Sequence, residues 1–425
     1  MGAGMDGKHG VQTSVHASKP TLKPLAPGAW LGVIGGGQLG RMFAQAAQRL
    51  GYRVIVLDPL RDGPAGQVAD EQIVAAYDDP AALALLAQRC TACTTEFESV
   101  PAASLSSLEL LGVNVSPPAE ALSVCQHRAR EKALFTATGV GCAPHAFIDD
   151  SASLAAASAL PLFPGILKTA TLGYDGKGQV AVTQPEDLAP AWAQLGRQPC
   201  LLELRLPLAF EISVVVARGR DAQVVALPPQ RNVHRHGILA TTQVPAPGVP
   251  PELAQQAVAQ AQALAVALNY VGVLCVEFFV LSDGRLLANE MAPRPHNSGH
   301  ASIDACDSSQ FDAQVRCLAQ LPLRTPRQHS AAVMLNLLGE LWWSGAAAAL
   351  HAETDPADST PSCGPTEPPW ARLLALPGTH LHLYGKAEPR PGRKMGHLTI
   401  TAADLRSAQA VARQATALLG LPDDV

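Results

Sequence analysis

The sequence lacks the features that mark membrane, secreted and nucleic-acid-binding proteins. It has no stretch of about 18 uncharged apolar residues, so no membrane-spanning helix is expected. Residues 1–29 have no apolar core behind their basic positions, which disfavours a secretory signal. The net charge is −5 and the pI is about 6.2, whereas general nucleic-acid binders usually have a basic face. These absences predict a cytoplasmic protein with neither a membrane nor a nucleic-acid partner.

Disulfide and nucleophile patterns are absent as well. The nine cysteines are scattered along the chain, which is typical of reduced thiols. Cys90 and Cys93 form a CxxC pair without a second pair at zinc spacing, so we interpret them as small core residues. No GxSxG motif occurs, and no cysteine has an obvious histidine partner. Covalent catalysis is therefore not expected, whereas phosphoryl transfer requires no such nucleophile.

The 425 residues are enough for two or three domains, and the hydrophobic content of 48% allows large cores although aromatic residues make up only 4%. A strand at 30–34, a glycine turn, an alanine-rich helix and a strand at 52–58 form a βαβ unit. A single helix is expected over 119–138. We predict a disordered extension over 1–29, a Rossmann-like α/β sheet over 30–120, an α+β domain over 121–325 and a β-rich domain over 326–425.

The glycine turn GGGQLG at 35–40 satisfies the GxGxxG pattern, and Asp58 ends the next strand at the spacing of a ribose-binding acid. Taken alone, these residues predict a dinucleotide-dependent dehydrogenase. The pattern is weak, because glycine turns at the first βα junction occur in many α/β folds. The backbone amides at the helix N-terminus still suit an anion.

A second glycine-rich segment, KTATLGYDGKGQ at 168–179, lies far from the first. Its three glycines would let backbone N–H groups approach a phosphate. Lys168 and Lys177 would add positive charge. The segment is not a P-loop, since GxxxxGK[ST] occurs nowhere in the chain. An ordinary hairpin loop is the alternative, but a dehydrogenase needs no second phosphate-binding loop.

Two carboxylates are predicted to face each other on a β-hairpin. The sequence SDGR at 282–285 indicates a hairpin whose two-residue turn is Asp-Gly. In that register Glu277 lies directly opposite Glu290, although a slip of one residue would break the pairing. Like charges so placed are destabilising by themselves, and the flanking residues are too apolar for an exposed strand. A shared Mg²⁺ ion that carries nucleotide phosphates would remove the conflict.

Histidines and basic residues mark two further segments. RNVHRHGIL at 231–239 contains His234 and His236 without further zinc ligands, so a phosphate or nucleotide contact is favoured. The segment LHLYGKAEPRPGRKMGH at 381–397 concentrates positive charge around glycines and prolines. A solvated basic loop and the wall of a pocket for a phosphate monoester both fit this composition.

Taken in order, these motifs closely resemble one ATP-grasp family, the N5-carboxyaminoimidazole ribonucleotide synthases of purine biosynthesis. The matching stretches lie between residues 30 and 400 and are IGGGQLGRM, EFESVP, KTATLGYDGKGQ, FEISVVVARG, HRHGIL, VEFFV, NEMAPRPHNSGH and YGKAEPRPGRKMGH. The resemblance implies a Rossmann-like pre-ATP-grasp domain, an ATP-grasp domain and a small C-terminal β-rich domain, in a homodimer. It also implies that ATP, bicarbonate and 5-aminoimidazole ribonucleotide react through carboxyphosphate to the N5-carboxylated ribonucleotide, ADP and phosphate.

The resemblance assigns roles to individual residues. It implies that ATP is bound by Arg128, Lys168, Gly173, Tyr174, Asp175, Gly176, Lys177, Gly178, Gln179, Glu203, Glu211, His234, Asn289 and Glu290. The substrate side is implied for Tyr174, Arg294, Asn297, Ser298, Lys386, Arg393 and Lys394, and catalysis for Arg294, His296, Asp175 and Lys394. Glu277 and Glu290 match Mg²⁺ ligands, with Mn²⁺ as an alternative, in agreement with the hairpin. Either Asp175 or His296 could accept a proton.

The sequence departs from the family pattern at several positions. His127 stands where many members have Asp, and Ser99 replaces the usual Asn. Residues 170–172, within the glycine-rich segment, differ from members that have arginines and an extra glycine there. The segment around 340–372 is longer than usual. Another ATP-grasp ligase, a dehydrogenase and a non-catalytic nucleotide-binding module remain as alternatives.

Overall fold

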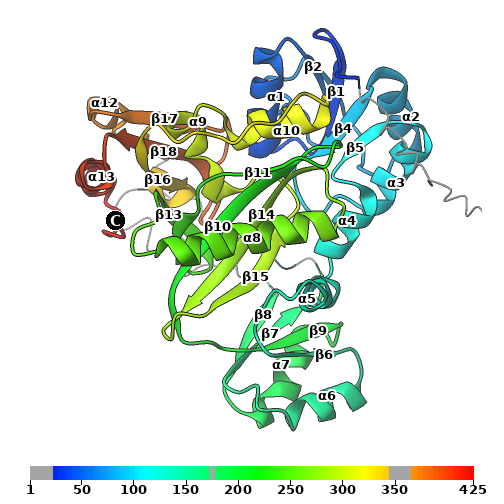
Figure 1. Ribbon diagram of the computed structural model, residues 1–425, viewed down its shortest axis with the longest axis vertical. Helices are drawn as coiled ribbons and strands as arrows, with labels where there is room; N and C mark the ends of the chain where they lie inside the picture. Colours follow the sequence, from blue (N-terminus) through cyan, green and yellow to red (C-terminus); the bar gives the residue numbers. More distant parts are fainter. Residues whose placement is uncertain (1–22, 172, 174–177, 344–364) are drawn as a thin grey trace, which may run out of the picture.

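The chain folds around three β-sheets, and the computed structural model describes residues 23–171, 173, 178–343 and 365–425 (Figure 1). Within those residues, no helix is both long and apolar enough to cross a membrane. Residues 23–29, expected to belong to a disordered extension, lie against the first domain. The Leu25 N–H donates to the Ala319 carbonyl (2.9 Å), and the Tyr52 hydroxyl donates to the Leu25 carbonyl (2.8 Å).

The first sheet is parallel and has the strand order β3-β2-β1-β4-β5, as a Rossmann-like sheet requires. Its strands are β1 (Trp30–Ile34), β2 (Arg53–Leu57), β3 (Glu71–Ile73), β4 (Ala92–Thr95) and β5 (Asn114–Ser116). The helices around it are α1 (Gln38–Arg49), α2 (Pro80–Arg89) and α3 (Ala102–Leu110). Strand β1 and residues 54–57 of β2 are apolar and almost entirely buried because helices cover both faces of the sheet. Cys90 and Cys93 are buried in the same core, as predicted.

The second sheet is small and antiparallel, with the order β6-β9-β7-β8. It consists of β6 (His145–Ile148), β7 (Gly165–Thr169), β8 (Gln179–Val182) and β9 (Cys200–Leu204), covered by α6 (Ser151–Ser158), the short η1 (Pro185–Asp187) and α7 (Leu188–Gln194). Two helices, α4 (Ala119–Cys125) and α5 (Arg128–Ala137), precede it. The single helix expected over 119–138 is therefore wrong. The chain leaves the helical conformation at His127, whose backbone is extended, while the Gln126 side chain donates to the Glu98 and Val100 carbonyls.

The third sheet has nine strands and joins two predicted domains. Its order is β15-β14-β10-β12-β13-β16-β18-β17, and β11 (Val224–Ala226) pairs with β10. The other strands are β10 (Leu208–Arg218), β12 (Gln230–Arg235), β13 (Ile238–Val244), β14 (Gly272–Leu281), β15 (Leu286–Ala292), β16 (Ala331–Leu338), β17 (Thr379–Leu383) and β18 (Lys394–Ala402). Because β13 pairs with β16, for example Thr242 with Met334, the sheet continues across the boundary predicted near residue 325.

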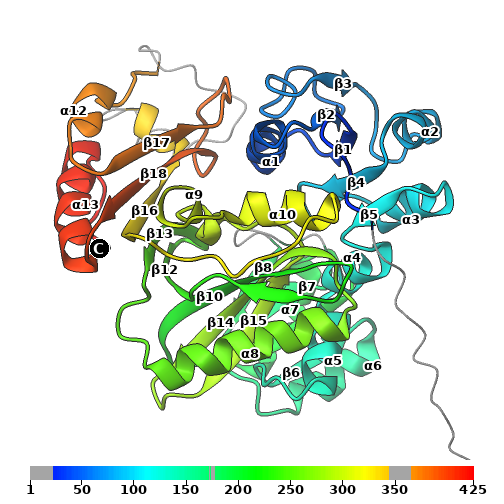
Figure 2. The same cartoon turned by 45° about the horizontal axis from the view of Figure 1, so that its top comes forward.

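Helices cover the nine-stranded sheet along its length (Figure 2). They are α8 (Pro251–Ala267), α9 (Ser302–Ala305), α10 (Gln310–Leu318), α12 (Trp370–Leu374) and α13 (Leu405–Leu419), with short turns η2 (Asn297–Gly299) and η3 (Gly339–Trp342). Helix α8 buries alanines and Leu264 against β10 and β14. Helix α13 packs its alanine face against β16 and β18. Most of the longer segment predicted around 340–372, residues 344–364, lies outside the described residues.

The glycine turn before α1 is filled by the protein's own carboxylates. Glu96 accepts the N–H of Gly37 (2.9 Å) on one oxygen and those of Leu39 and Gly40 (3.1 Å each) on the other. Asp58 accepts the Gly36 N–H (2.6 Å). A Cβ on Gly37 would lie 2.3 Å from a Glu96 oxygen, so glycine is required by Glu96 and not by a bound pyrophosphate. The dehydrogenase interpretation is therefore wrong.

We predict that Glu96→Gln lowers the free energy of unfolding by about 1–3 kcal/mol, because an amide nitrogen would be placed against backbone donors. Urea denaturation measures the effect. The control is Glu71→Gln on β3, since Glu71 is exposed and its ion pair with Arg89 stabilises by about 0–1 kcal/mol. Equal stability losses in the two variants would contradict the role given to Glu96.

Candidate active site

The hairpin of β14 and β15 places Glu277 opposite Glu290, as predicted. The predicted turn is wrong in detail. The Leu281 N–H donates to the Arg285 carbonyl (2.9 Å), so the loop has three residues and ends at Gly284 with a positive φ of 86°. The register then shifts between Glu277 and Phe278, where β15 contains one extra residue, and this bulge restores the predicted pairing.

Helix α5 satisfies the backbone groups on either side of Glu290. Lys132 donates to the Asn289 carbonyl (2.7 Å), and Glu131 accepts the Met291 N–H (2.5 Å). Burial raises the pKa of Glu131 to about 8, against the opposing charge of Lys132. These contacts replace hydrogen bonds that the bulge removes from the sheet, so the orientation of Glu290 depends on α5.

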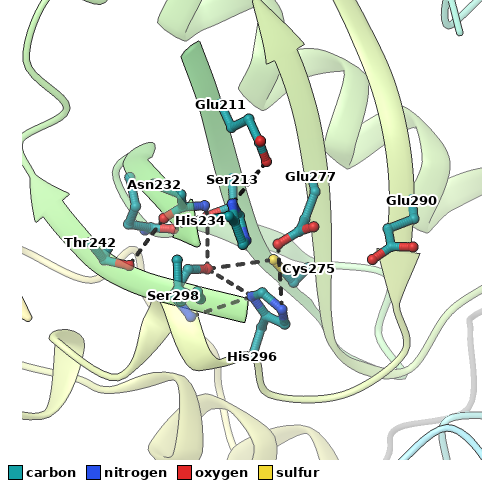
Figure 3. A network of polar contacts seen from close by, with 12 residues as sticks. Glu211, Ser213, Asn232, His234, Thr242, Cys275, Glu277, Glu290, His296 and Ser298 are labelled. Atoms are coloured by element: carbon teal, nitrogen blue, oxygen red, sulfur yellow. Dashed lines mark hydrogen bonds and ion pairs between the residues drawn. The ribbon is translucent and has the colours of Figure 1, made fainter. Parts of the chain in front are cut away.

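Glu277 and Glu290 repel each other in a poorly solvated place. Burial, followed by the charge of Glu290, raises the pKa of Glu277 to about 7. Figure 3 shows both side chains pointing from neighbouring strands toward the same space. On its outer side Glu290 forms an ion pair with Arg128 (3.2 Å). Two facing carboxylates, of which Glu277 has a raised pKa, are a donor set that fits a hard divalent cation.

Two lysines of the candidate site lie on or next to the four-stranded sheet. Lys168 on β7 forms an ion pair with Glu203 on β9, and Lys132 pairs with the other Glu203 oxygen (2.7 Å). Burial raises the pKa of Glu203, but the two lysines outweigh it and hold this pKa at about 2. Glu203 therefore stays anionic and pairs with both lysines. Lys168 thus lies close to α5, which carries Lys132.

The glycine-rich segment begins and ends beside these cations. Arg128 donates to the Gly173 carbonyl (3.3 Å), and the Thr169 N–H donates to the Gly178 carbonyl (2.8 Å). Gln179 pairs with Lys168 in the ladder of β7 and β8. The other predicted site residues of this segment lie outside the described residues and are Tyr174, Asp175, Gly176 and Lys177.

Glu211 and His234 meet on neighbouring strands β10 and β12. His234 Nδ1 lies 2.9 Å from a Glu211 oxygen (Figure 3). Burial lowers the pKa of His234, but the hydrogen bond to Glu211 and nearby carboxylates raise it above its ordinary value overall. The pair supplies a carboxylate and an imidazole beside Glu277. His236 lies in the tight turn after β12 with a φ of 50° and has no place in this pair.

Beyond Glu290, the chain turns His296 back toward Glu277. His296 Nε2 lies 3.5 Å from a Glu277 oxygen, and its Nδ1 lies 2.9 Å from the Ser298 hydroxyl. Burial and nearby cations lower the pKa of His296 well below its usual value, so the ring is neutral. Ser298 is fully buried, and its hydroxyl oxygen accepts a hydrogen bond from the Ser213 hydroxyl (2.7 Å), which anchors the segment to β10 (Figure 3). Asn297 is buried, and both polar atoms of its amide have no hydrogen-bond partner among the described residues.

Arg294 connects this segment to the first domain through an ion pair with Glu98. Burial raises the pKa of Glu98, but Arg294, and Lys394 to a smaller extent, bring it below its ordinary value. The basic loop, residues 384–393, leads into Lys394 at the start of β18. The charge of Lys394 also lowers the pKa of Glu277, so this end of the loop lies near the carboxylate pair. Within that loop Lys386 donates to the Lys394 carbonyl (2.7 Å), and Arg393 donates to the Glu388 carbonyl (2.8 Å). The predicted site residues thus come from the four-stranded and nine-stranded sheets and the segments beside them, while the first domain contributes Glu98, which was not predicted.

Family models match most of the chain. Residues 29–126 match the ribonucleotide synthetase preATP-grasp domain, 133–311 the ATP-grasp domain and 332–411 the phosphoribosylaminoimidazole carboxylase C-terminal domain. The N5-carboxyaminoimidazole ribonucleotide synthase of Brucella melitensis biotype 1 is 44% identical over 377 residues, which are 88% of this chain and 97% of the relative. That of Bacillus subtilis strain 168 is 38% identical over 375 residues, 88% of this chain and 91% of the relative.

The chain belongs to the N5-carboxyaminoimidazole ribonucleotide synthase family.

Solved structures of this family have the same fold. The ADP complex of an N5-carboxyaminoimidazole ribonucleotide synthetase superposes with a TM-score of 0.82 at 38% identity, covering 92% of this chain and 98% of that chain. The Aspergillus clavatus synthase in complex with ADP and 5-aminoimidazole ribonucleotide has a TM-score of 0.80 at 29% identity, covering 92% and 99%. The resemblance inferred from the motifs and the three-part fold are confirmed. The chain is an ATP-dependent ligase that forms N5-carboxyaminoimidazole ribonucleotide from 5-aminoimidazole ribonucleotide and bicarbonate in purine biosynthesis.

Three charged residues of this synthase site were missed in the sequence. Glu98 lies in EFESVP, and Glu131 and Lys132 lie in HRAREK, two stretches from which only other residues were singled out. Their partners Arg294, Met291 and Asn289 are between 157 and 196 positions away in the chain. The local signal is that Glu131 and Lys132, two opposite charges, are adjacent near the start of a helix. Many helices with solvated charges have such a pair, so it does not indicate a buried site.

We predict that Lys132→Met lowers the free energy of unfolding by about 3–5 kcal/mol, because it removes one of the two cations paired with the buried Glu203 and leaves the Asn289 carbonyl without its donor. It should also slow turnover through displacement of Glu290. Thermal unfolding and steady-state assays measure these effects. Arg130→Met on the same helix is the control, since its ion pair with Glu120 is exposed and stabilises by about 0–1 kcal/mol. Similar losses in the two variants would argue against the role of Lys132.

Proposed function

We propose that the synthase reaction proceeds through carboxyphosphate, with Glu277 and Glu290 between a nucleotide side and a substrate side. The observation that supports this most is the placement of the two carboxylates. Arg128 lies on one flank of the pair and His296 on the other. Phosphoryl transfer depends mainly on positioning and charge stabilisation, and this arrangement offers both.

On the nucleotide side, Arg128 and Lys168 would contact ATP phosphates beneath the glycine-rich segment. Both cations are held by carboxylates of the protein, Glu290 and Glu203, so their positions are set before a ligand arrives. Glu211 would bind the ribose while His234 holds its carboxylate. Water exclusion by the segment around Gly173 and Gly178 would protect carboxyphosphate from hydrolysis.

Glu277 and Glu290 would hold Mg²⁺ or Mn²⁺, because their mutual repulsion and the raised pKa of Glu277 indicate a place for positive charge. When bound, the ion neutralises charge on the ATP phosphates. His296 keeps the Glu277 carboxylate oriented toward Glu290. Its own neutrality avoids competition between an imidazolium and a cation.

On the substrate side, Arg294 would balance charge on the phosphoryl group and on bicarbonate. Asn297 supports binding there, since its buried amide lacks partners in the described residues. Lys386, Arg393 and Lys394 would contact the phosphate of the ribonucleotide. The proton lost from the exocyclic amine would pass to His296, which is neutral, or to Asp175, so the choice between the two predicted acceptors stays open. We also expect a cytoplasmic homodimer.

An assay of phosphate release tests this proposal. With Mg-ATP and bicarbonate, we expect addition of 5-aminoimidazole ribonucleotide to stimulate phosphate release, because carboxylation of its amine removes carboxyphosphate. N5-Carboxyaminoimidazole ribonucleotide should accumulate in equal amount. Phosphate release without any response to the ribonucleotide would overturn the proposed order of steps.

The Glu290→Gln variant tests the carboxylate pair. We predict at least about a hundredfold lower turnover, because Glu290 would no longer hold the divalent ion that neutralises the ATP phosphates, and a thermal midpoint close to that of the wild type. Glu252→Gln, an exposed change at the start of α8, is the matched control and should retain turnover. Wild-type activity in Glu290→Gln would refute the metal assignment.

A further inference from the structure

A second group of metal-ligand side chains lies where α9 meets the edge of the nine-stranded sheet. Asp304 on α9, His382 on β17 and His397 on β18 each offer a ligand atom, and these atoms lie within 4.8 Å of one another. Helix α9 is adjacent to β18 in both the contact pattern and Figure 2. The three residues come from three elements, and the chemistry proposed above uses none of them.

The sheet register places the two imidazoles together. His382 and His397 are directly opposite in the ladder of β17 and β18, and their rings stack with centroids 4.3 Å apart. The Asp304 carboxylate reaches this pair from α9, with one oxygen 2.9 Å from His382 Nε2. Its second oxygen lies 3.6 Å from His380 Nδ1.

His397 has a buried nitrogen that nothing in the described chain satisfies. Its Nδ1 lies 2.9 Å from the Tyr384 hydroxyl, whereas its Nε2 has no hydrogen-bond partner, and the side chain is fully buried. An unpaired buried polar atom costs about 1–3 kcal/mol and therefore requires an explanation.

We propose that Asp304, His382 and His397 bind one divalent transition-metal ion, with zinc as the preferred occupant. Two imidazoles and a carboxylate are a ligand set that favours zinc over magnesium, which prefers oxygen ligands. The fourth coordination position is left for a water molecule. Asp304 and His382 are only partly buried, so solvent can reach the ion.

Small side-chain movements are enough to form the site. Tetrahedral ligands about 2.0–2.2 Å from zinc lie roughly 3.3 Å from one another. The 2.9 Å contact between Asp304 and His382 opens slightly, and the stacked rings tilt so that both nitrogens point at the ion. Tyr384 accepts the Nδ1 proton of His397 and thereby fixes the tautomer that leaves Nε2 free, as outer hydrogen bonds commonly do for zinc-binding histidines.

The bound ion joins α9 to the strands on either side of the basic loop. Asp304 follows the His296–Ser298 segment in the chain, and Lys394 begins β18 three residues before His397. The ion therefore fixes the basic loop relative to the carboxylate pair. Its role is structural, and the proposal does not depend on the carboxyphosphate steps.

Metal uptake by the full-length protein without an affinity tag tests the proposal. After chelator treatment and dialysis, zinc binding is measured by elemental analysis and cobalt binding by visible absorption, which reports tetrahedral coordination. We expect one zinc ion per chain in the wild type and also in Glu290→Gln, because the nucleotide carboxylates do not contribute. His382→Gln and Asp304→Asn should bind zinc at least about a hundredfold more weakly, since even outer-sphere changes cost about 10–100-fold.

His329→Gln is the control, because His329 is exposed and its side chain forms a hydrogen bond with its neighbour Ser330, away from the three proposed ligands. Zinc should raise the thermal midpoint of the wild type and of this control but not that of His382→Gln, which removes only a partly buried ligand. Three outcomes would overturn the proposal: no stoichiometric uptake, uptake unchanged in both ligand variants, or uptake abolished by Glu290→Gln. The last outcome would locate the ion at the nucleotide carboxylates.

Discussion

The site depends on one nearly inaccessible cation, Lys132. A buried ammonium group is stable only when it is fully paired, and Lys132 achieves this by contacting Glu203 on the small sheet and the Asn289 carbonyl on the large sheet. The same contacts stabilise the bulge beside Glu290 and hold Lys168 through the shared Glu203. The charges proposed to bind phosphate and metal are thereby positioned by a single helix that belongs to neither sheet.

Around this cation, the protein pairs nearly every acidic group of the site with a base of its own. Arg128 pairs with Glu290 and Arg294 with Glu98, while the contact of Glu277 is with the neutral His296. Burial and the charge of Glu290 raise the pKa of Glu277, and the charges of His234 and Lys394 do not offset them. The excess negative charge therefore lies at Glu277, where the proposed chemistry requires a bound cation. The other ion pairs hold the neighbouring side chains in position without a ligand.

Local patterns predicted the strands, most helices and the carboxylate pair, because alternation and turn residues are short-range signals. The pairing of Glu277 with Glu290 was correct although the turn was misjudged, since the bulge compensates for the longer loop. The glycine turn was misread as a dinucleotide site because its occupant, Glu96, is 59 positions from Gly37. The contacts of Lys132 were likewise invisible, since burial of a charge depends on tertiary packing.

The unbroken pairing of β13 with β16 has a mechanical consequence. A backbone ladder cannot slide without loss of several hydrogen bonds at once, so the C-terminal strands and the large sheet behave as one rigid plate. The basic loop before Lys394 is part of that plate. The four-stranded sheet has its own ladder and touches the plate chiefly through side chains of α5. A change in the distance between Lys168 and the carboxylate pair therefore requires the four-stranded sheet to tilt against the nine-stranded sheet.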